Sequence, residues 1–192
     1  APMQIVIVPI YRNEEGKNIV LPKVEEIQKK LELNDIRIHV DDREGLSPGY
    51  KFNDWELKGV PLRIEIGPKD IENQKIVVAK RYNLEKIDLS FEEIEKIPLI
   101  LDEIQVEMLK KAKEQAQNNT LEITDYLEFK SKIEKGGFFN SPWCGKLECE
   151  DKIKEETGAE IRVIPFNSED NTKECIYCKE PSTSIPIFAR GY

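Results

Sequence analysis

The feature that most constrains the fold is a strand–helix–strand pattern at the start of the chain. The stretch "QIVIVPI" (4–10) is apolar and rich in β-branched residues, which is typical of a buried strand. After it, "KNIVLPKVEEIQKKLELN" carries the apolar stripe of an amphipathic helix, with Pro22 in the first turn. The stripe consists of Val20, Val24, Ile27 and Leu31. "IRIHVDDR" (36–43) then alternates apolar and polar residues, so the pattern predicts a βαβ unit in a partly parallel sheet.

The next segments of the chain continue this first α/β unit, and a second unit is predicted beyond residue 118. "PLRIEIG" (61–67) and "QKIVVAKRY" (74–82) are further strands, and the short turn between them favours a hairpin and hence a mixed sheet. A capping box at Ser90 and Glu93 opens a helical region whose apolar residues are expected to face the core. Those residues are Leu101, Ile104, Met108 and Leu109. "NNT" (118–120) is the best candidate linker, which gives domains of 1–118 and 119–192.

Composition limits the possible partners. The net charge is -8 with a sequence pI near 5.0, which argues against indiscriminate binding to nucleic acid such as DNA. Charges are balanced over residues 36–86, so any single-stranded RNA is expected to meet this part of the chain. No apolar run is long enough for a transmembrane helix, and no membrane partner is expected. The first residues are not a signal peptide, and a cytoplasmic location is expected. The absence of an initiator Met, with a strand that begins almost at once, suggests a fragment of a longer chain.

Four cysteines predict a metal site in the second unit. Cys144 and Cys149 lie in "WCGKLEC", and Cys175 and Cys178 lie in "CIYC". Two close pairs with this separation suit four thiolates around one tetrahedral Zn²⁺ ion, which leaves no position for a water and makes the ion structural. Two disulfides or a redox-active C-x-x-C are the alternatives, and nothing in the sequence favours either. The intervening segment predicts a helix that ends at Gly158, followed by a strand.

No complete catalytic site is recognisable in the sequence. His39 is the only histidine, and its alternation places it on the polar face of its strand. The phosphate-binding pattern G-x-x-x-x-G-K-[ST] is absent, and no nucleophile has a base beside it. We therefore assign no catalytic residues.

The stretch "YKFNDWELKGVPLRIEIGPKD" (50–70) combines the side chains that read a guanine. On a short helix that ends at Gly59, Phe52 and Glu56 share one face. On the strand that follows, Arg63 shares a face with Glu65. An aromatic ring stacks on a base, Arg or Lys binds guanine O6 and N7, and a carboxylate accepts from guanine N1–H and N2–H. A charged surface with aromatic residues at its edge is the alternative on chemistry alone.

Residues 40–70, "VDDREGLSPGYKFNDWELKGVPLRIEIGPKD", closely resemble the anticodon-binding domain of class II prolyl-tRNA synthetases of the archaeal and eukaryotic type. The resemblance continues through "QKIVVAKR" and "SPWCGKLEC…CIYC" to the terminal "FARGY", and covers essentially the whole chain. It implies a mixed five-stranded sheet flanked by helices, followed by a small zinc-stapled α/β domain.

The resemblance also implies a function and its residues. Such enzymes join proline to tRNA(Pro) with ATP, and their anticodon domain reads two guanines. The implied readers are Phe52 by stacking and Glu56, Arg63, Lys69 and Asp70 at base edges, while a contribution from Lys80 or Arg81 stays open. The implied Zn²⁺ ligands are Cys144, Cys149, Cys175 and Cys178.

The class II catalytic core and its ATP site are not in these residues, so the chain corresponds to the C-terminal part of such an enzyme. Its expected partners are the anticodon loop of tRNA(Pro), the catalytic domain and a second copy in a homodimer of the full-length enzyme. Tyr192 matches a terminal tyrosine whose carboxylate can approach the catalytic domain; a frayed terminus is the alternative. The competing hypotheses are a zinc-stapled protein-interaction module and a free-standing accessory protein with the same fold.

Overall fold

The computed structural model describes residues 1–191 of the chain. They form two compact units, Ala1–Lys110 and from Lys111 onward, each with its own hydrophobic core. The division falls within the long helix α4 (Ile97–Asn118). Among the described residues, no helix is both long enough and apolar enough to cross a membrane.

The first unit is built on a five-stranded mixed sheet. Its strands follow the order β2-β1-β3-β4-β5; β1 is parallel to β2 and β3, and β4 is antiparallel to β3 and β5. This confirms the predicted βαβ unit and the mixed α/β sheet. The elements are β1 (Ile5–Pro9), α1 (Glu14–Glu32), β2 (Ile38–Val40), α2 (Pro48–Leu57), β3 (Leu62–Ile66), α3 (Pro68–Glu72), β4 (Lys75–Lys80), β5 (Lys86–Ser90), the 3-10 helix η1 (Phe91–Lys96) and the start of α4.

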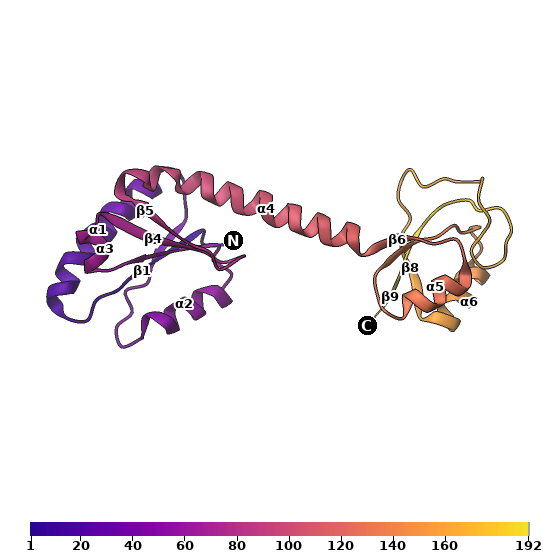
Figure 1. The fold of residues 1–192 in the computed structure, drawn as a ribbon, viewed down its shortest axis with the longest axis horizontal. Coiled ribbons are helices and arrows are strands. Elements are labelled where there is room, and N and C mark those ends of the chain that lie inside the picture. Colours follow the sequence, from indigo (N-terminus) through magenta and orange to yellow (C-terminus); the bar gives the residue numbers. More distant parts are fainter. Residues whose placement is uncertain (192) are drawn as a thin grey trace. The chain divides into compact units, whose positions relative to one another are not determined.

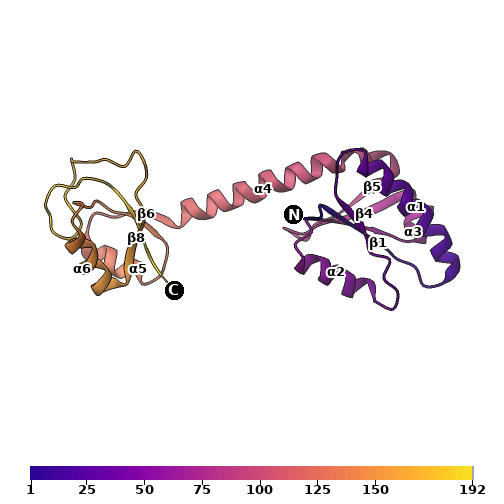
Figure 2. The same ribbon diagram turned by 180° about the vertical axis from the view of Figure 1, so that it is seen from behind.

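Helices cover the two faces of this sheet unequally. Helices α1 and α3 and the start of α4 lie on one face, and α2 lies on the other (Figures 1 and 2). The four predicted stripe residues of α1 are all buried in the larger core. The predicted start of α1 was wrong, because the Asn13 side chain accepts a hydrogen bond from Gly16 N at 2.9 Å and begins the helix three residues earlier. Pro22 therefore lies inside the helix and not in its first turn.

Helix α4 is only partly buried in the first unit. Leu101 and Ile104 face the core as predicted, but Met108 is 44% exposed and Leu109 is 57% exposed. The prediction failed for these two residues because the buried face of α4 ends at Ile104.

The second unit contains a four-stranded sheet of order β6-β7-β9-β8. Helices α5 and α6 lie side by side in both ribbon views (Figures 1 and 2), and the rings of Phe129, Phe139 and Phe188 pack edge-to-face in the core beneath them. Helix α6 ends at Gly158 with φ 70°, which confirms the predicted cap. The elements are β6 (Thr120–Glu122), α5 (Tyr126–Ile133), β7 (Phe138–Asn140), α6 (Leu147–Thr157), β8 (Ala159–Val163) and β9 (Ile187–Arg190).

Candidate functional site

Helix α2 presents the first predicted site residues. The Ser47 hydroxyl oxygen accepts from Tyr50 N at 3.2 Å and begins the helix, and the chain leaves it at Gly59 with φ 78°. Trp55 packs against Val6 and Val8 of the sheet. Phe52 and Glu56 lie one turn apart on the helix, which places them together beside β3.

A buried ionic cluster fixes α2 to the end of β2. The fully buried carboxylate of Asp41 accepts from Arg43 Nε at 2.8 Å, Arg43 Nη2 at 2.7 Å and Trp55 Nε1 at 2.8 Å. Lys51 is 5% exposed, and its Nζ donates to the main-chain oxygen of Asp41 at 2.9 Å. Burial opposes ionisation of Asp41, but the bonds from Arg43 and Trp55 and the charge of Lys51 outweigh it and hold the pKa of Asp41 well below its usual range.

Arg63 is the centre of the candidate reader. Its guanidinium carbon lies 4.1 Å from the centroid of the Phe52 ring, which is a cation–π contact. Its Nη1 donates to Glu56 Oε1 at 2.6 Å, and its Nε and Nη2 donate to Glu65 Oε1 at 3.1 and 3.0 Å. Lys86 Nζ donates to Glu65 Oε2 at 2.9 Å. Two cations and two carboxylates therefore form a charge-balanced cluster beside an aromatic ring.

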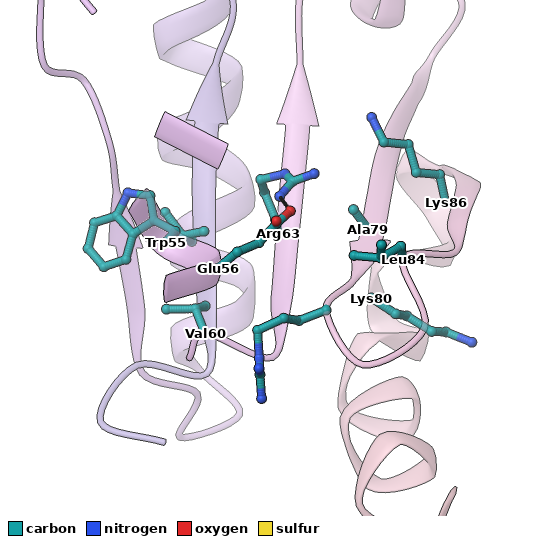
Figure 3. A pocket seen from close by; sticks show the side chains of 10 residues that line it. Trp55, Glu56, Val60, Arg63, Ala79, Lys80, Leu84 and Lys86 are labelled. Atoms are coloured by element: carbon teal, nitrogen blue, oxygen red, sulfur yellow. Dashed lines mark hydrogen bonds and ion pairs between the residues drawn. The ribbon is translucent and has the colours of Figure 1, made fainter. Parts of the chain in front are cut away.

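The sheet register explains why residues distant in sequence meet at this cluster. Arg63 of β3 lies opposite Ala79 of β4, which lies opposite Lys86 of β5. These residues line a cavity of about 120 Å³ beside α2. In Figure 3 Glu56 and Arg63 point toward one another, while Lys80, Leu84 and Lys86 belong to the β4–β5 hairpin.

Lys69 and Asp70 lie at the other end of β3. They line a different cavity, together with Tyr11, Arg12 and neighbours at the end of β1. Asp70 Oδ2 accepts from Gly67 N at 2.8 Å and begins α3. The structure thus brings together Phe52, Glu56 and Arg63 but not Lys69 and Asp70.

The four cysteines gather at one point of the second unit. All four Sγ atoms lie within 4.8 Å of one another, and three of the residues are buried. Cys144 Sγ lies 3.6 Å from Cys149 Sγ and 3.7 Å from Cys178 Sγ. Tetrahedral ligation with Zn–S bonds of about 2.3 Å requires S–S separations of roughly 3.8 Å. The cluster therefore fits one metal ion, with all four positions filled by thiolates.

The surroundings of the cysteines affect their ionisation in opposite directions. Burial raises the pKa of the Cys149 and Cys144 thiols. Burial also opposes ionisation of Cys175, but backbone hydrogen bonds from Cys178 and Tyr177 outweigh it and lower the pKa of that thiol. Backbone N–H groups directed at a cysteine sulfur stabilise a thiolate, which is the form that binds a metal.

Glu156 of α6 ties the cysteine site to helix α5. Its carboxylate accepts from Lys130 Nζ at 2.8 Å and from the hydroxyls of Tyr126 and Tyr177, each at 3.1 Å. Tyr177 lies between Cys175 and Cys178, so one carboxylate joins both helices to the second cysteine pair.

Comparisons with known proteins give the class of the first unit. Residues 4–99, half of the chain, match the family described as "Anticodon binding domain". The chain therefore belongs to the anticodon-binding domain family. Residues 126–192 match the family described as "Prolyl-tRNA synthetase, C-terminal".

Three relatives are similar over the whole chain. It is 45% identical to a protein of Acetoanaerobium sticklandii and 43% identical to one of Cenarchaeum symbiosum, each named proline–tRNA ligase. It is 42% identical to proline–tRNA ligase 2 of Clostridioides difficile. In each case the match covers all of this chain but only 40% of the relative.

Sequence reasoning missed three residues at these sites. Lys86 contacts the cluster only through the β4–β5 register, and β5 was not identified from its own residues. Asp41 and Lys51 gave no sign of burial, because both are charged and the alternation of residues 36–43 places Asp41 on the polar face. Tyr192, predicted to matter at the terminus, lies outside the described residues.

Proposed function

We propose that this chain is the anticodon-recognition and zinc-binding C-terminal portion of a proline–tRNA ligase, with domains at 1–118 and 119–192. The similarity to proline–tRNA ligases along its full length supports this proposal. The ATP-dependent joining of proline to tRNA(Pro) would belong to the part of such an enzyme that these residues do not match. Its partners would be the tRNA(Pro) anticodon loop, that catalytic domain and a second copy of the enzyme in the cytoplasm.

The observation that carries the proposal is the contact of Arg63 with Phe52 and Glu56, beside a cavity that Glu56 and Arg63 line. Guanine offers donors at N1 and N2 and acceptors at O6 and N7, which suit a carboxylate and a guanidinium side by side. Because Glu56 and Arg63 pair with one another without RNA, a guanine has to replace that pair with its own hydrogen bonds. Phe52 supplies the adjacent aromatic face.

Lys69 and Asp70 would read the second guanine. They follow β3, and Arg63 is four residues before Gly67, the first residue after the strand, which places the two positions at least about 13 Å apart along the sheet. This separation suits two bases that are splayed apart rather than stacked on one another. Asp70 already holds Gly67 N, so Lys69 is the freer of the two side chains to meet a base.

The test measures fluorescence anisotropy of this chain with a proline anticodon stem-loop. Replacement of either guanine by adenine should weaken binding by roughly tenfold, the effect of about 1.4 kcal/mol for one lost base contact. Single-atom analogues then assign the residues. Inosine lacks the N2 amine, and the loss of affinity that it causes in the wild type should disappear in Glu56→Gln. 7-Deazaguanine lacks N7, and the loss of affinity that it causes should disappear in Arg63→Gln.

The matched control is Asp88→Asn, which removes a carboxylate from the neighbouring strand β5 at a side chain that is 57% exposed. It should leave all affinities unchanged. Binding that ignores both guanines, or no binding at low salt, would contradict the proposal.

A further inference from the structure

Among the cationic side chains that line the cavity beside Glu56 and Arg63, one differs from the others because it has no carboxylate partner in the described part of the chain. Arg63, Lys80 and Lys86 each pair with a carboxylate, at 2.6 Å to Glu56, 3.1 Å to Glu85 and 2.8 Å to Glu65. Arg81 lines the same cavity. Within residues 1–191 no hydrogen bond or ion pair is formed by its guanidinium, and its Nε is buried without a partner. Buried donors are nearly always satisfied, so an unpaired guanidinium requires an explanation.

A second hollow lies directly beside the reader. It is lined by Arg81 together with Asn53, Glu56, Leu57 and Leu84. Glu56 and Arg81 line both cavities, so a group held by Arg81 is next to a group held by Glu56. Two adjoining sites that share their polar side chains suit two adjoining parts of one ligand.

Two of the five side chains that line this hollow, Leu57 and Leu84, are apolar and exposed. Leu57 at the end of α2 is 90% exposed, and Leu84 in the β4–β5 turn is 71% exposed. Leu84 has φ 61°, a conformation that is unfavourable for a side chain branched beyond Cβ. The turn is held there because Lys80 N donates to Glu85 O at 2.9 Å and Glu85 N donates to Asn83 Oδ1 at 3.1 Å. Strain maintained by surrounding bonds is typical of binding sites.

We propose that Arg81 binds the backbone phosphate next to the nucleotide read by Glu56 and Arg63, with the sugar resting between Leu57 and Leu84. This inference rests on the proposed function. Arg81 has donors only, and its planar fork matches two phosphate oxygens. A phosphate joins neighbouring nucleotides, which accounts for a cation site that adjoins a base site. The side chains of Leu57 and Leu84 carry no donors or acceptors, so they do not select a particular base.

The test combines a chemical change in the RNA with a change in the protein. A proline anticodon stem-loop is made with single neutral methylphosphonate linkages at each position of the loop, and anisotropy gives the affinity of this 192-residue chain. One linkage should weaken wild-type binding by roughly five- to tenfold. Arg81→Gln should weaken binding to the unmodified loop by the same factor. In this variant the methylphosphonate at that linkage should cause no further loss of affinity.

Salt dependence separates a phosphate from a base contact. For single-stranded RNA, one lost phosphate contact reduces the slope of log K against log salt by about 0.7. Arg81→Gln should show this reduced slope and retain the wild-type discrimination between guanine and adenine. Arg81→Lys should retain the slope because it keeps the charge. The control is Arg37→Gln, which removes the same charge from a side chain whose bonds, among the residues that the structure describes, go only to the oxygens of Ala1 and Pro2.

Two results would overturn the inference. One is an Arg81→Gln variant, folded by circular dichroism, whose salt slope equals that of Arg37→Gln. The other is a variant that loses guanine discrimination with its slope unchanged, which would assign Arg81 to a base. If replacement of either guanine leaves the affinity of the wild-type chain unchanged, the proposed function itself is wrong. That result is obtained without any Arg81 variant, so the two failures are distinguishable.

Discussion

Replacement of Asp41 by Asn should destabilise the first unit strongly, because it removes the charge that balances a buried cluster. Asn offers one acceptor oxygen in place of two, so its NH2 group must face donors: Arg43 Nε at the Oδ1 position, or both Arg43 Nη2 and Trp55 Nε1 at the Oδ2 position. Lys51, 5% exposed, keeps only the main-chain oxygen at 2.9 Å and loses the carboxylate at 3.8 Å. Breaking a buried pair costs about 3–5 kcal/mol, and since Arg43 is 40% exposed we expect the lower end, about 3 kcal/mol.

The assay is urea unfolding followed by the fluorescence of Trp55. A Trp143→Phe background leaves this as the one tryptophan, so the signal reports the first unit alone. With an m value of about 1.5 kcal/mol per M, the midpoint should fall by about 2 M. The control is Asp54→Asn, whose partner bonds to Arg43 and Lys58 are more exposed, and it should cost less than about 1 kcal/mol.

The same cluster predicts a pH dependence with a definite sign. The pKa of Asp41 is lower in the folded state than the ordinary value of 3.8, so the folded state binds fewer protons and ionised Asp41 stabilises it. The difference between wild type and Asp41→Asn should be complete at neutral pH, begin to shrink below about pH 4, and disappear as the pH falls through the folded pKa. A midpoint shift no larger than that of Asp54→Asn, or a difference independent of pH, would refute the reasoning.

Two predictions concern the second unit. Metal analysis should find about one Zn²⁺ per chain in the wild type and none in Cys175→Ser. A chelator should unfold this unit while Trp55 fluorescence is unchanged. A metal-free chain with unchanged stability would contradict the metal site. Gly158→Ala should cost about 1 kcal/mol from its positive φ, plus the strain of a Cβ 3.3 Å from Arg190 Nε. Gly136→Ala is the control, because this residue also has positive φ but open space around its Cβ. The difference between the two variants, followed by Trp143 fluorescence in a Trp55→Phe background, gives the strain of the Cβ against Arg190. Equal losses of stability would contradict the prediction.

The elements that the sequence predicts best are those with long periodic patterns. The 4-3-4 stripe of α1 depends on local spacing and is buried as expected. The alternation of β3 does not predict that Arg63 and Glu65 are buried along with its apolar residues. Strand β5 (Lys86–Ser90) was not predicted, because its two apolar residues stand among polar and charged residues and its strand conformation depends on pairing with β4. Met108 and Leu109 continue the apolar pattern of α4, but they lie beyond the part of the helix that packs against the core.

The candidate sites divide in the same way. Four cysteines in two pairs carry their geometry in their spacing, and the structure gathers them at one point. Phe52 and Glu56 meet Arg63 through helical spacing and strand alternation, which are also local. The separation of Lys69 and Asp70 from Arg63, and the burial of Asp41, depend on where strands end in three dimensions, and no local pattern contains that information.

Under the proposed function, the mutual pairing of Glu56 and Arg63 would have a consequence for the fidelity of base recognition. In the absence of RNA neither side chain lacks a partner, so an incoming base enters a competition with a bond that already exists. A guanine would compensate both side chains at once. A base that bonded to only one of them would separate the pair, so that Glu56 would lose its donor or Arg63 would keep only its bonds to Glu65. A wrong base would therefore lose its own contact and also break this pair, and the resting site would favour rejection over partial acceptance.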